Sequence, residues 1–189
     1  MSGLAQFVAA RGLGTLQEWC EEGYQRVMQT DKKISEQLGI PTSIKTTSIK
    51  PSGTVSLLAG ATPGMHYPES RFYLRRVRLS ADSDLIPTLQ EAGYSIEAST
   101  TDPEGTVVVK IPVDVGEGVR TVEEVSMWEQ LSFAAFLQRF WADNQVSCTV
   151  TFDPDKEGPH LTHALDYFQY QLKGVSFLPR INYGAFPQV

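Results

Sequence analysis

Apolar side chains recur every three to four residues between Thr15 and Leu38, and this spacing predicts an amphipathic helix. Thr15 with Glu18 three residues later is a capping-box pattern, and Gly39 followed by Pro41 ends the repeat. We therefore expect a helix over 15–38, interrupted near residue 30.

Three further segments show helical spacing: 84–92, 125–142 and 160–172. Gly93 stops the first of them. The second has the widest apolar face, formed by Trp128, Leu131, Ala135, Phe136, Phe140 and Trp141. These aromatic residues are expected to belong to the core rather than to a surface that stacks nucleic-acid bases.

Other segments are rich in β-branched residues or alternate between apolar and polar positions, which predicts strands. They are 44–49, 71–79, 106–113, 144–152 and 175–178. A glycine- and proline-rich stretch over 60–70 is expected to be an irregular loop. From residue 144 onward the order is strand, helix, strand, which implies parallel strands with a covering helix. The simplest organisation is one α/β unit over residues 1–189.

Composition narrows the function classes. With 41% hydrophobic and 20% charged residues the chain is typical of globular proteins, and its net charge of -6 argues against broad binding of nucleic-acid phosphates. No apolar run is long enough to span a membrane, and the first residues do not form a secretory signal. Two cysteines are too few for a disulfide scaffold. We expect a cytoplasmic protein without a membrane or a direct nucleic-acid partner.

The turn from Pro51 to Ser56 is the strongest candidate for a ligand-binding site in the sequence. Proline ends a predicted strand, and the small residues Ser52, Gly53 and Thr54 allow backbone amides to approach a ligand closely. Val55 and Ser56 then begin a predicted helix, whose N-terminal amides and nearby hydroxyls suit an anion such as phosphate. An ordinary serine or threonine N-cap explains the same residues without any ligand, and the turn alone does not decide between the two.

The longer string around this turn is more specific. The segment 43–66 (SIKTTSIKPSGTVSLLAGATPGMH) closely resembles the monomeric adenosylcobalamin-dependent ribonucleoside-triphosphate reductases, a class II ribonucleotide reductase family. The resemblance continues, in the family's order and spacing, through 73–78 (YLRRVR), 141–147 (WADNQVS) and 172–179 (LKGVSFLP). It covers most of the chain from about Trp19 onward.

The resemblance implies an α/β fold that is a segment of the family's ten-stranded α/β barrel, a mixed sheet with covering helices. It also implies that the turn formed by Pro51, Ser52, Gly53, Thr54, Val55 and Ser56 holds the phosphates of a ribonucleoside triphosphate substrate. Adenosylcobalamin is the implied cofactor of the complete enzyme and a dithiol its reductant. His66, after the glycine- and proline-rich loop, is expected either to line the mouth of an active site or to be an ordinary surface histidine.

The family reduces the ribose 2′ position with a cysteine thiyl radical and a glutamate two residues beyond that cysteine. Cys20 and Glu22 match this spacing, but the asparagine and proline that precede the family's cysteine are missing. On a helix these two side chains would lie about 200° apart around the axis. Cys148 lies in a predicted strand and is expected to be a buried, packed thiol. No catalytic residue is therefore assigned, and the chain alone is predicted to be inactive.

These considerations predict a C-terminal part of a reductase barrel, whose N-terminal part would be a partner on the same or a separate chain. The alternative is a non-catalytic nucleotide-binding or regulatory module derived from the reductase barrel.

Two remaining clusters of polar residues give weaker indications of a binding site. His160, His163 and Asp166 have a spacing that could face a metal, but a solvent-facing helical turn is preferred and no metal site is assigned. Arg71, Arg75, Arg76 and Arg78 form one basic cluster, in which strand alternation separates Arg75 from Arg76 and Arg78. These arginines are expected to form structural ion pairs or to contact a nucleotide or cobalamin phosphate.

Overall fold

The computed structural model describes residues 1–53 and 55–181 and divides them into two compact units. The larger unit comprises Met1–Glu69 and Val115–Ile181, and the described part of the smaller unit is Ser70–Asp114. The prediction of one unit over 1–189, as the C-terminal part of a reductase barrel, stays a prediction.

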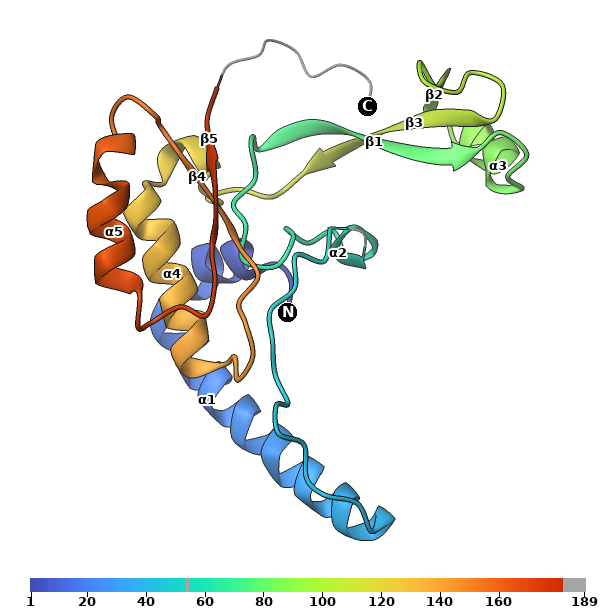
Figure 1. The fold of residues 1–189 in the computed structure, drawn as a ribbon. Helices are drawn as coiled ribbons and strands as arrows, with labels where there is room; N and C mark the ends of the chain where they lie inside the picture. The colour runs from blue at the N-terminus through green and yellow to red at the C-terminus, as the bar shows by residue number, and fades with distance from the viewer. Residues whose placement is uncertain (54, 182–189) are drawn as a thin grey trace. The chain divides into compact units, whose positions relative to one another are not determined.

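The larger unit opens with helix α1 (Leu4–Leu38), which starts eleven residues before the predicted Thr15 (Figure 1). Gly12 has non-helical angles (φ 80°, ψ 166°) and kinks the helix, so the predicted start at Thr15 lies shortly after the kink and not where the helix begins. The Phe7 and Trp19 rings meet at 5.2 Å across the bend, whereas twelve residues of straight helix span about 18 Å. The predicted interruption near residue 30 is wrong, since Gly12 is the only residue with non-helical angles inside α1.

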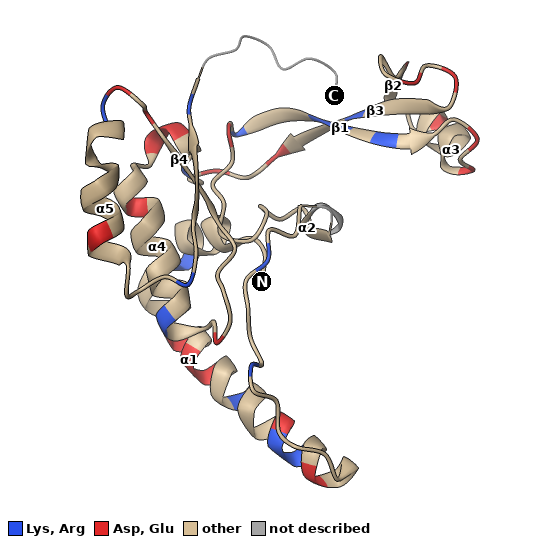
Figure 2. Ribbon diagram, in the orientation of Figure 1, with Lys and Arg blue, Asp and Glu red and all other residues tan. Residues whose placement is uncertain are grey.

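The outer half of α1 carries both signs of charge along its length (Figure 2). Beyond Cys20, only Ser35 of this helix is buried. The apolar side chains of Ile34 and Leu38 in this half are exposed, so the outer half buries little apolar surface and the buried residues near the start attach α1 to the core.

Helices α4 (Met127–Phe140) and α5 (Leu161–Phe168) lie beside strands β4 (Thr149–Phe152) and β5 (Ser176–Pro179) (Figure 1). The two strands pair in parallel, with Thr149 opposite Ser176, which confirms the predicted strand–helix–strand arrangement. Short 3₁₀ turns, η1 (Val122–Glu124) and η2 (Gly158–His160), precede the two helices. Ser126 caps α4 by accepting a hydrogen bond from the Glu129 amide, and Glu129 completes a capping box.

The core of this unit is formed by α4 and β4, with contributions from α1. Leu131 and Leu137 of α4 and Val150 of β4 are at most 1% exposed, and they pack in one cluster with Leu16 and Cys20. The buried face of α4 differs from the predicted one, because Trp128 stays 36% exposed at its edge. The other predicted aromatic residues, Phe136, Phe140 and Trp141, do pack against the core.

The predicted strand over 44–49 is wrong for most of its length. Only Ile49 forms a β-bridge, in parallel with Val146, and it is fully buried. The segment is held mainly by side chains: the Asp143 carboxylate accepts hydrogen bonds from the Thr46 amide (3.2 Å) and hydroxyl (2.9 Å). The segment is rich in β-branched residues, but without a neighbouring strand to pair with along its length its backbone stays irregular.

The smaller unit is an antiparallel sheet with strand order β1-β3-β2. Strands β1 (Phe72–Ser80) and β3 (Thr106–Asp114) match the predicted segments, and α3 (Leu85–Glu91) matches the predicted short helix. Strand β2 (Ser95–Ala98) was not predicted, and it pairs with β3 through Ser95 opposite Lys110.

The described strands thus form an antiparallel and a parallel sheet in a fold of mixed α/β content. A closed ten-stranded barrel is not present in residues 1–53 and 55–181. Among the same residues, no helix combines the length and apolar character needed to cross a membrane.

Candidate functional site

The predicted phosphate turn follows directly from the buried bridge at Ile49. The Ile49 carbonyl accepts a hydrogen bond from the Ser147 amide at 2.9 Å, and Pro51 then ends the extended segment. The backbone leading into the turn is therefore fixed to the core of the larger unit.

Ser52 is the conformational centre of the turn. It has a positive φ of 52°, which is uncommon for a residue other than glycine. Its hydroxyl accepts a hydrogen bond from the Gly64 amide at 3.1 Å and lies 2.5 Å from the Ser2 hydroxyl. Its carbonyl accepts a hydrogen bond from the Ser56 amide at 3.0 Å. Ser52 thus links the N-terminus, the turn and the glycine-rich loop that follows.

A helix does start at this turn, as predicted, but α2 (Val55–Leu58) is only one turn long. Ser56 is 1% exposed, and its hydroxyl makes no hydrogen bond to any described residue. A buried polar group without a partner costs free energy, and a bound ligand or water that hydrogen-bonds to it would remove that cost. Thr54 of the predicted cradle lies outside the described residues.

Thr62, which the sequence patterns did not predict as a site residue, is a second buried hydroxyl in the same loop region. It is 2% exposed, and its hydroxyl also has no hydrogen-bond partner among the described residues. The Ala61 amide donates to the Ser56 carbonyl at 2.9 Å, which brings the chain back towards α2 just before Thr62. No local sequence signal distinguishes Thr62 from other loop threonines.

Gly64 is the residue at which the loop backbone approaches the segment before the turn most closely. It has a φ of 50°, and a Cβ at this position would lie 2.7 Å from the Lys50 carbonyl oxygen. The close approach brings the segment before the turn and the loop after it into direct backbone contact. Only glycine meets both conditions without strain.

His66 joins the loop to strand β4. Its Nε2 accepts a hydrogen bond from the Thr149 amide at 3.1 Å, so the ring proton of the neutral form lies on Nδ1, which donates to the Pro63 carbonyl at 3.1 Å. Both ring nitrogens are therefore engaged in holding the loop. That His66 lines an active-site mouth stays a prediction.

Both cysteines are free and buried. Cys20 is 2% exposed in the core cluster, and burial, followed by the charge of Glu21, raises the pKa of its thiol. Burial alone raises the pKa of Cys148 to about 11. Packed thiols in this state are poor nucleophiles at neutral pH. That neither cysteine is catalytic stays a prediction.

The two weaker clusters are placed as follows. His160, His163 and Asp166 are exposed, and no group of three potential metal ligands occurs among the described residues. Arg71 forms an ion pair with Asp114 at 3.3 Å. This is the structural ion pair that was one of the two expectations for the basic cluster. On β1, Arg76 and Arg78 lie on the exposed face and Arg75 on the other, as alternation predicted.

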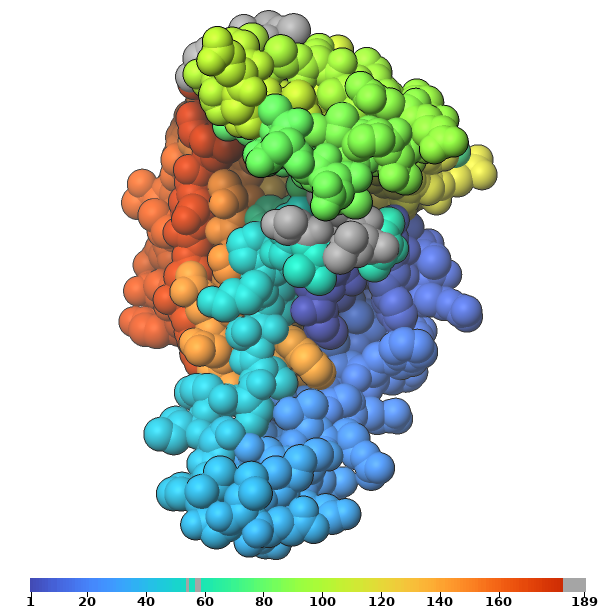
Figure 3. Space-filling model, turned by 90° about the vertical axis from the view of Figure 1, so that its right-hand side faces the viewer, coloured from blue at the N-terminus to red at the C-terminus, as the bar shows by residue number. Residues whose placement is uncertain are grey.

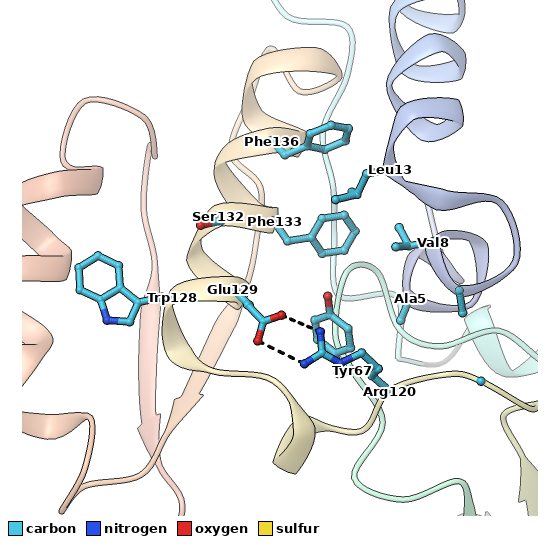
Figure 4. A pocket seen from close by; sticks show the side chains of 12 residues that line it. Ala5, Val8, Leu13, Tyr67, Arg120, Trp128, Glu129, Ser132, Phe133 and Phe136 are labelled. Carbon is cyan, nitrogen blue, oxygen red and sulfur yellow. Dashed lines mark hydrogen bonds and ion pairs between the residues drawn. The ribbon is translucent and has the colours of Figure 1, made fainter.

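A pocket of about 630 Å³ lies between the start of α1 and α4 (Figure 4). Val8 and Leu13 face Phe133 and Phe136 across it. Its two charged groups are paired with each other: the Arg120 guanidinium donates to both oxygens of Glu129, at 2.6 and 3.3 Å. This hydrogen bond from Arg120 is the main reason that the pKa of Glu129 is lowered. The pocket is therefore largely apolar in character.

Comparisons with known proteins agree with the sequence resemblance. The chain is 63% identical over 179 residues to a probable adenosylcobalamin-dependent ribonucleoside-triphosphate reductase of Dictyostelium discoideum, and 58% identical over 189 residues to that of Euglena gracilis. Its fold matches the crystal structure of a B12-dependent (class II) ribonucleotide reductase with a TM-score of 0.81 and 36% identity over 93% of this chain. This chain is homologous to one segment of the adenosylcobalamin-dependent ribonucleoside-triphosphate reductases.

The chain spans only about a quarter of these reductases: 24% of the Dictyostelium relative, 26% of the Euglena relative and 24% of the crystal structure. No protein-family model matches it. The resemblance inferred from the string around Ser52 is confirmed, together with the mixed α/β fold of a class II reductase. The comparisons assign no role to individual residues of the phosphate turn.

Proposed function

We propose that this chain is the substrate-phosphate-binding segment of an adenosylcobalamin-dependent ribonucleoside-triphosphate reductase, which converts ribonucleotides to deoxyribonucleotides. The observation that carries the proposal is the buried hydroxyl of Ser56 in the single turn of α2, which has no hydrogen-bond partner among the described residues. The names of the relatives supply the reaction and the substrate class.

In this proposal the residues of the turn act by binding and orienting the substrate. Pro51 ends the extended backbone, the small residues Ser52 and Gly53 allow the backbone to approach the phosphates closely, and Ser56 donates its hydroxyl hydrogen to a phosphate oxygen. Val55, the first residue of α2, belongs to the same proposed cradle, as does Thr54, which lies outside the described residues. Because the phosphates lie far from the reacting ribose, these contacts position the sugar rather than take part in the chemistry.

In the complete reductase a dithiol would be oxidised to a disulfide while the ribose 2′ hydroxyl leaves as water and is replaced by hydrogen. Adenosylcobalamin would supply the radical that starts this reduction. The pocket between the start of α1 and α4 is mainly apolar, and its two charged groups bind each other, so neither is free to hold this cofactor. We therefore assign no cofactor contact to this segment.

The proposal also includes the rest of the reductase as a partner, on the same or a separate chain, and a segment of the ten-stranded barrel as the architectural context. Turnover by this chain alone is not expected, since its two cysteines are packed in the core. A cytoplasmic location, suited to free nucleotide substrates, is part of the same proposal. The names of the relatives do not favour the alternative of a regulatory module.

Calorimetric titration of the chain with inorganic tripolyphosphate and with each ribonucleoside triphosphate tests the cradle. We expect binding of tripolyphosphate and of the nucleotides, and a loss of about tenfold in Ser56→Ala, because one charge-assisted hydrogen bond is removed. Ser132→Ala, on the exposed side of α4, is the control and should bind as the wild type does. A wild-type chain that binds none of these ligands would contradict the phosphate role.

A reductase assay tests the wider proposal. The chain is mixed with the remaining part of the Euglena reductase, adenosylcobalamin and a dithiol, and deoxyribonucleotide formation is measured. Product is expected only from the combination. Turnover by this chain alone would disprove the claim that it lacks the radical cysteine.

A further inference from the structure

Gln6, in the first turns of α1, bonds to three residues in two separate parts of the larger unit, the loop at 60–62 and Val115. Its side-chain nitrogen donates hydrogen bonds to the Val115 carbonyl at 2.9 Å and to the Gly60 carbonyl at 3.2 Å. Its side-chain oxygen accepts a hydrogen bond from the Thr62 amide at 2.9 Å. One amide group therefore holds the carbonyl of residue 60 and the amide of residue 62 at the same time.

The residues next to Gln6 contact the same loop. The Gly3 amide donates to the Thr62 carbonyl at 2.8 Å, and the Leu4 amide lies 3.4 Å from the Gly64 carbonyl. The Ser2 hydroxyl meets the Ser52 hydroxyl at 2.5 Å. In the space-filling view the dark blue start of the chain borders the turquoise atoms of the turn and loop (Figure 3).

The loop needs such support because its own local structure is weak. Helix α2 has four residues, and a single helical turn is unstable in isolation. Ser52, Gly60 and Gly64 all have positive φ angles, so three of the thirteen residues from 52 to 64 hold left-handed backbone conformations that do not continue a helix or strand. Two buried hydroxyls, of Ser56 and Thr62, also lack partners among the described residues and would favour an opened loop that reaches water.

We propose that Gln6 is a positioning residue for substrate binding, which fixes residues 60–62 and thereby holds Ser52 and Ser56 ready for the triphosphate. This inference rests on the phosphate role proposed above and extends it to a residue about fifty positions away in the sequence. Preorganised donors bind more tightly because the ordering of the loop does not have to be driven by the ligand. The amide is suited to this task because it donates and accepts at once.

The test compares Gln6→Met, which keeps the length of the side chain but cannot make these hydrogen bonds, with the wild type in the 189-residue chain. The control is Gln17→Met on the same helix, where the amide donates only to Glu21 at 3.2 Å within α1. The probes are inorganic tripolyphosphate, the ribonucleoside triphosphates and the matching nucleosides, titrated well below the thermal midpoint. We expect Gln6→Met to weaken tripolyphosphate and nucleotide binding by about tenfold and Gln17→Met to leave both unchanged.

A purely structural role would give a different result, namely a lower thermal midpoint with an unchanged dissociation constant for the folded chain, and this would overturn the inference. A wild type that binds no phosphate probe would overturn the proposed function itself, whereas equal binding by the wild type and Gln6→Met would overturn only the role of Gln6. A loss of the same size for the nucleosides would also count against it.

Hydrogen exchange of the wild type gives a second measurement that does not depend on the folding of a variant. The Thr62 amide should exchange slowly, because it donates to Gln6, and still more slowly when tripolyphosphate is bound. Exchange of this amide at the rate of an unprotected loop would show that the contact is open in solution and would overturn the inference.

Discussion

Replacement of Gly64 by alanine tests the backbone geometry on which the candidate site depends. At a φ of 50° an alanine costs about 1–2 kcal/mol more than glycine. The new Cβ would also lie 2.7 Å from the Lys50 carbonyl oxygen, and the backbone would have to move by a few tenths of an ångström. Overpacking of this kind costs roughly 1–3 kcal/mol. We therefore expect Gly64→Ala to lower the free energy of unfolding by about 3 kcal/mol.

Gly39→Ala is the matched control, since Gly39 has a similar φ of 66° and a Cβ there would meet nothing within 4 Å. It should lose only about 1 kcal/mol, the cost of the left-handed backbone. Both variants are compared with the wild type by urea unfolding followed by tryptophan fluorescence, with the slope of the transition checked for constancy. If the two alanines cost the same, the close approach between Gly64 and Lys50 does not exist and the reasoning about the loop fails.

Two further predictions concern stability and pH. The pKa of Cys148 is raised by burial from its ordinary value of 9.0 to about 11, so the free energy of unfolding should fall by up to about 2–3 kcal/mol between pH 9 and 11, as the unfolded thiol ionises first. Cys148→Val should lack this component in pH-dependent urea unfolding, and an unchanged pH dependence would argue that the thiol is accessible. Glu129→Gln should cost about 0.5–1 kcal/mol at pH 7, because the ion pair with Arg120 is half-exposed. The lowered pKa of Glu129 means that its contribution is lost as the pH falls below about 4.5, so thermal midpoints of wild type and variant should converge in acid, and a constant difference would contradict it.

Much of the fold follows from local patterns. The alternation over 71–79 predicted both the strand β1 and the separation of Arg75 from Arg76 and Arg78, because side chains on a strand point to opposite faces in turn. The order from residue 144 onward predicted the parallel pair β4–β5, since two parallel strands need a crossover connection.

The failures have physical causes that the local sequence does not contain. Gly12 lies before the predicted helix start at Thr15, yet it is a kink between two helical segments, and the rings of Phe7 and Trp19 meet across the bend. The segment 44–49 has strand-forming residues, but only Ile49 finds a partner, so composition without a ladder did not produce a strand. Strand β2 is short and weakly patterned, and its pairing with β3 defines it.

In the candidate site, too, some features follow from the local sequence and others depend on distant contacts. Small residues and hydroxyls at 51–56 drew attention to the turn, because their chemistry is local to the sequence. The parts that shape it are distant: Gly64 contacts Lys50 across the loop, and Gln6 bonds to residues 54 to 109 positions away. Such contacts form only after the larger unit has folded, so no spacing rule could have selected Gln6 or Thr62. A turn of this composition removed from that unit would keep its hydroxyl groups but lose the bonds that fix their positions, and with them the preorganisation that separates a phosphate cradle from an ordinary serine cap.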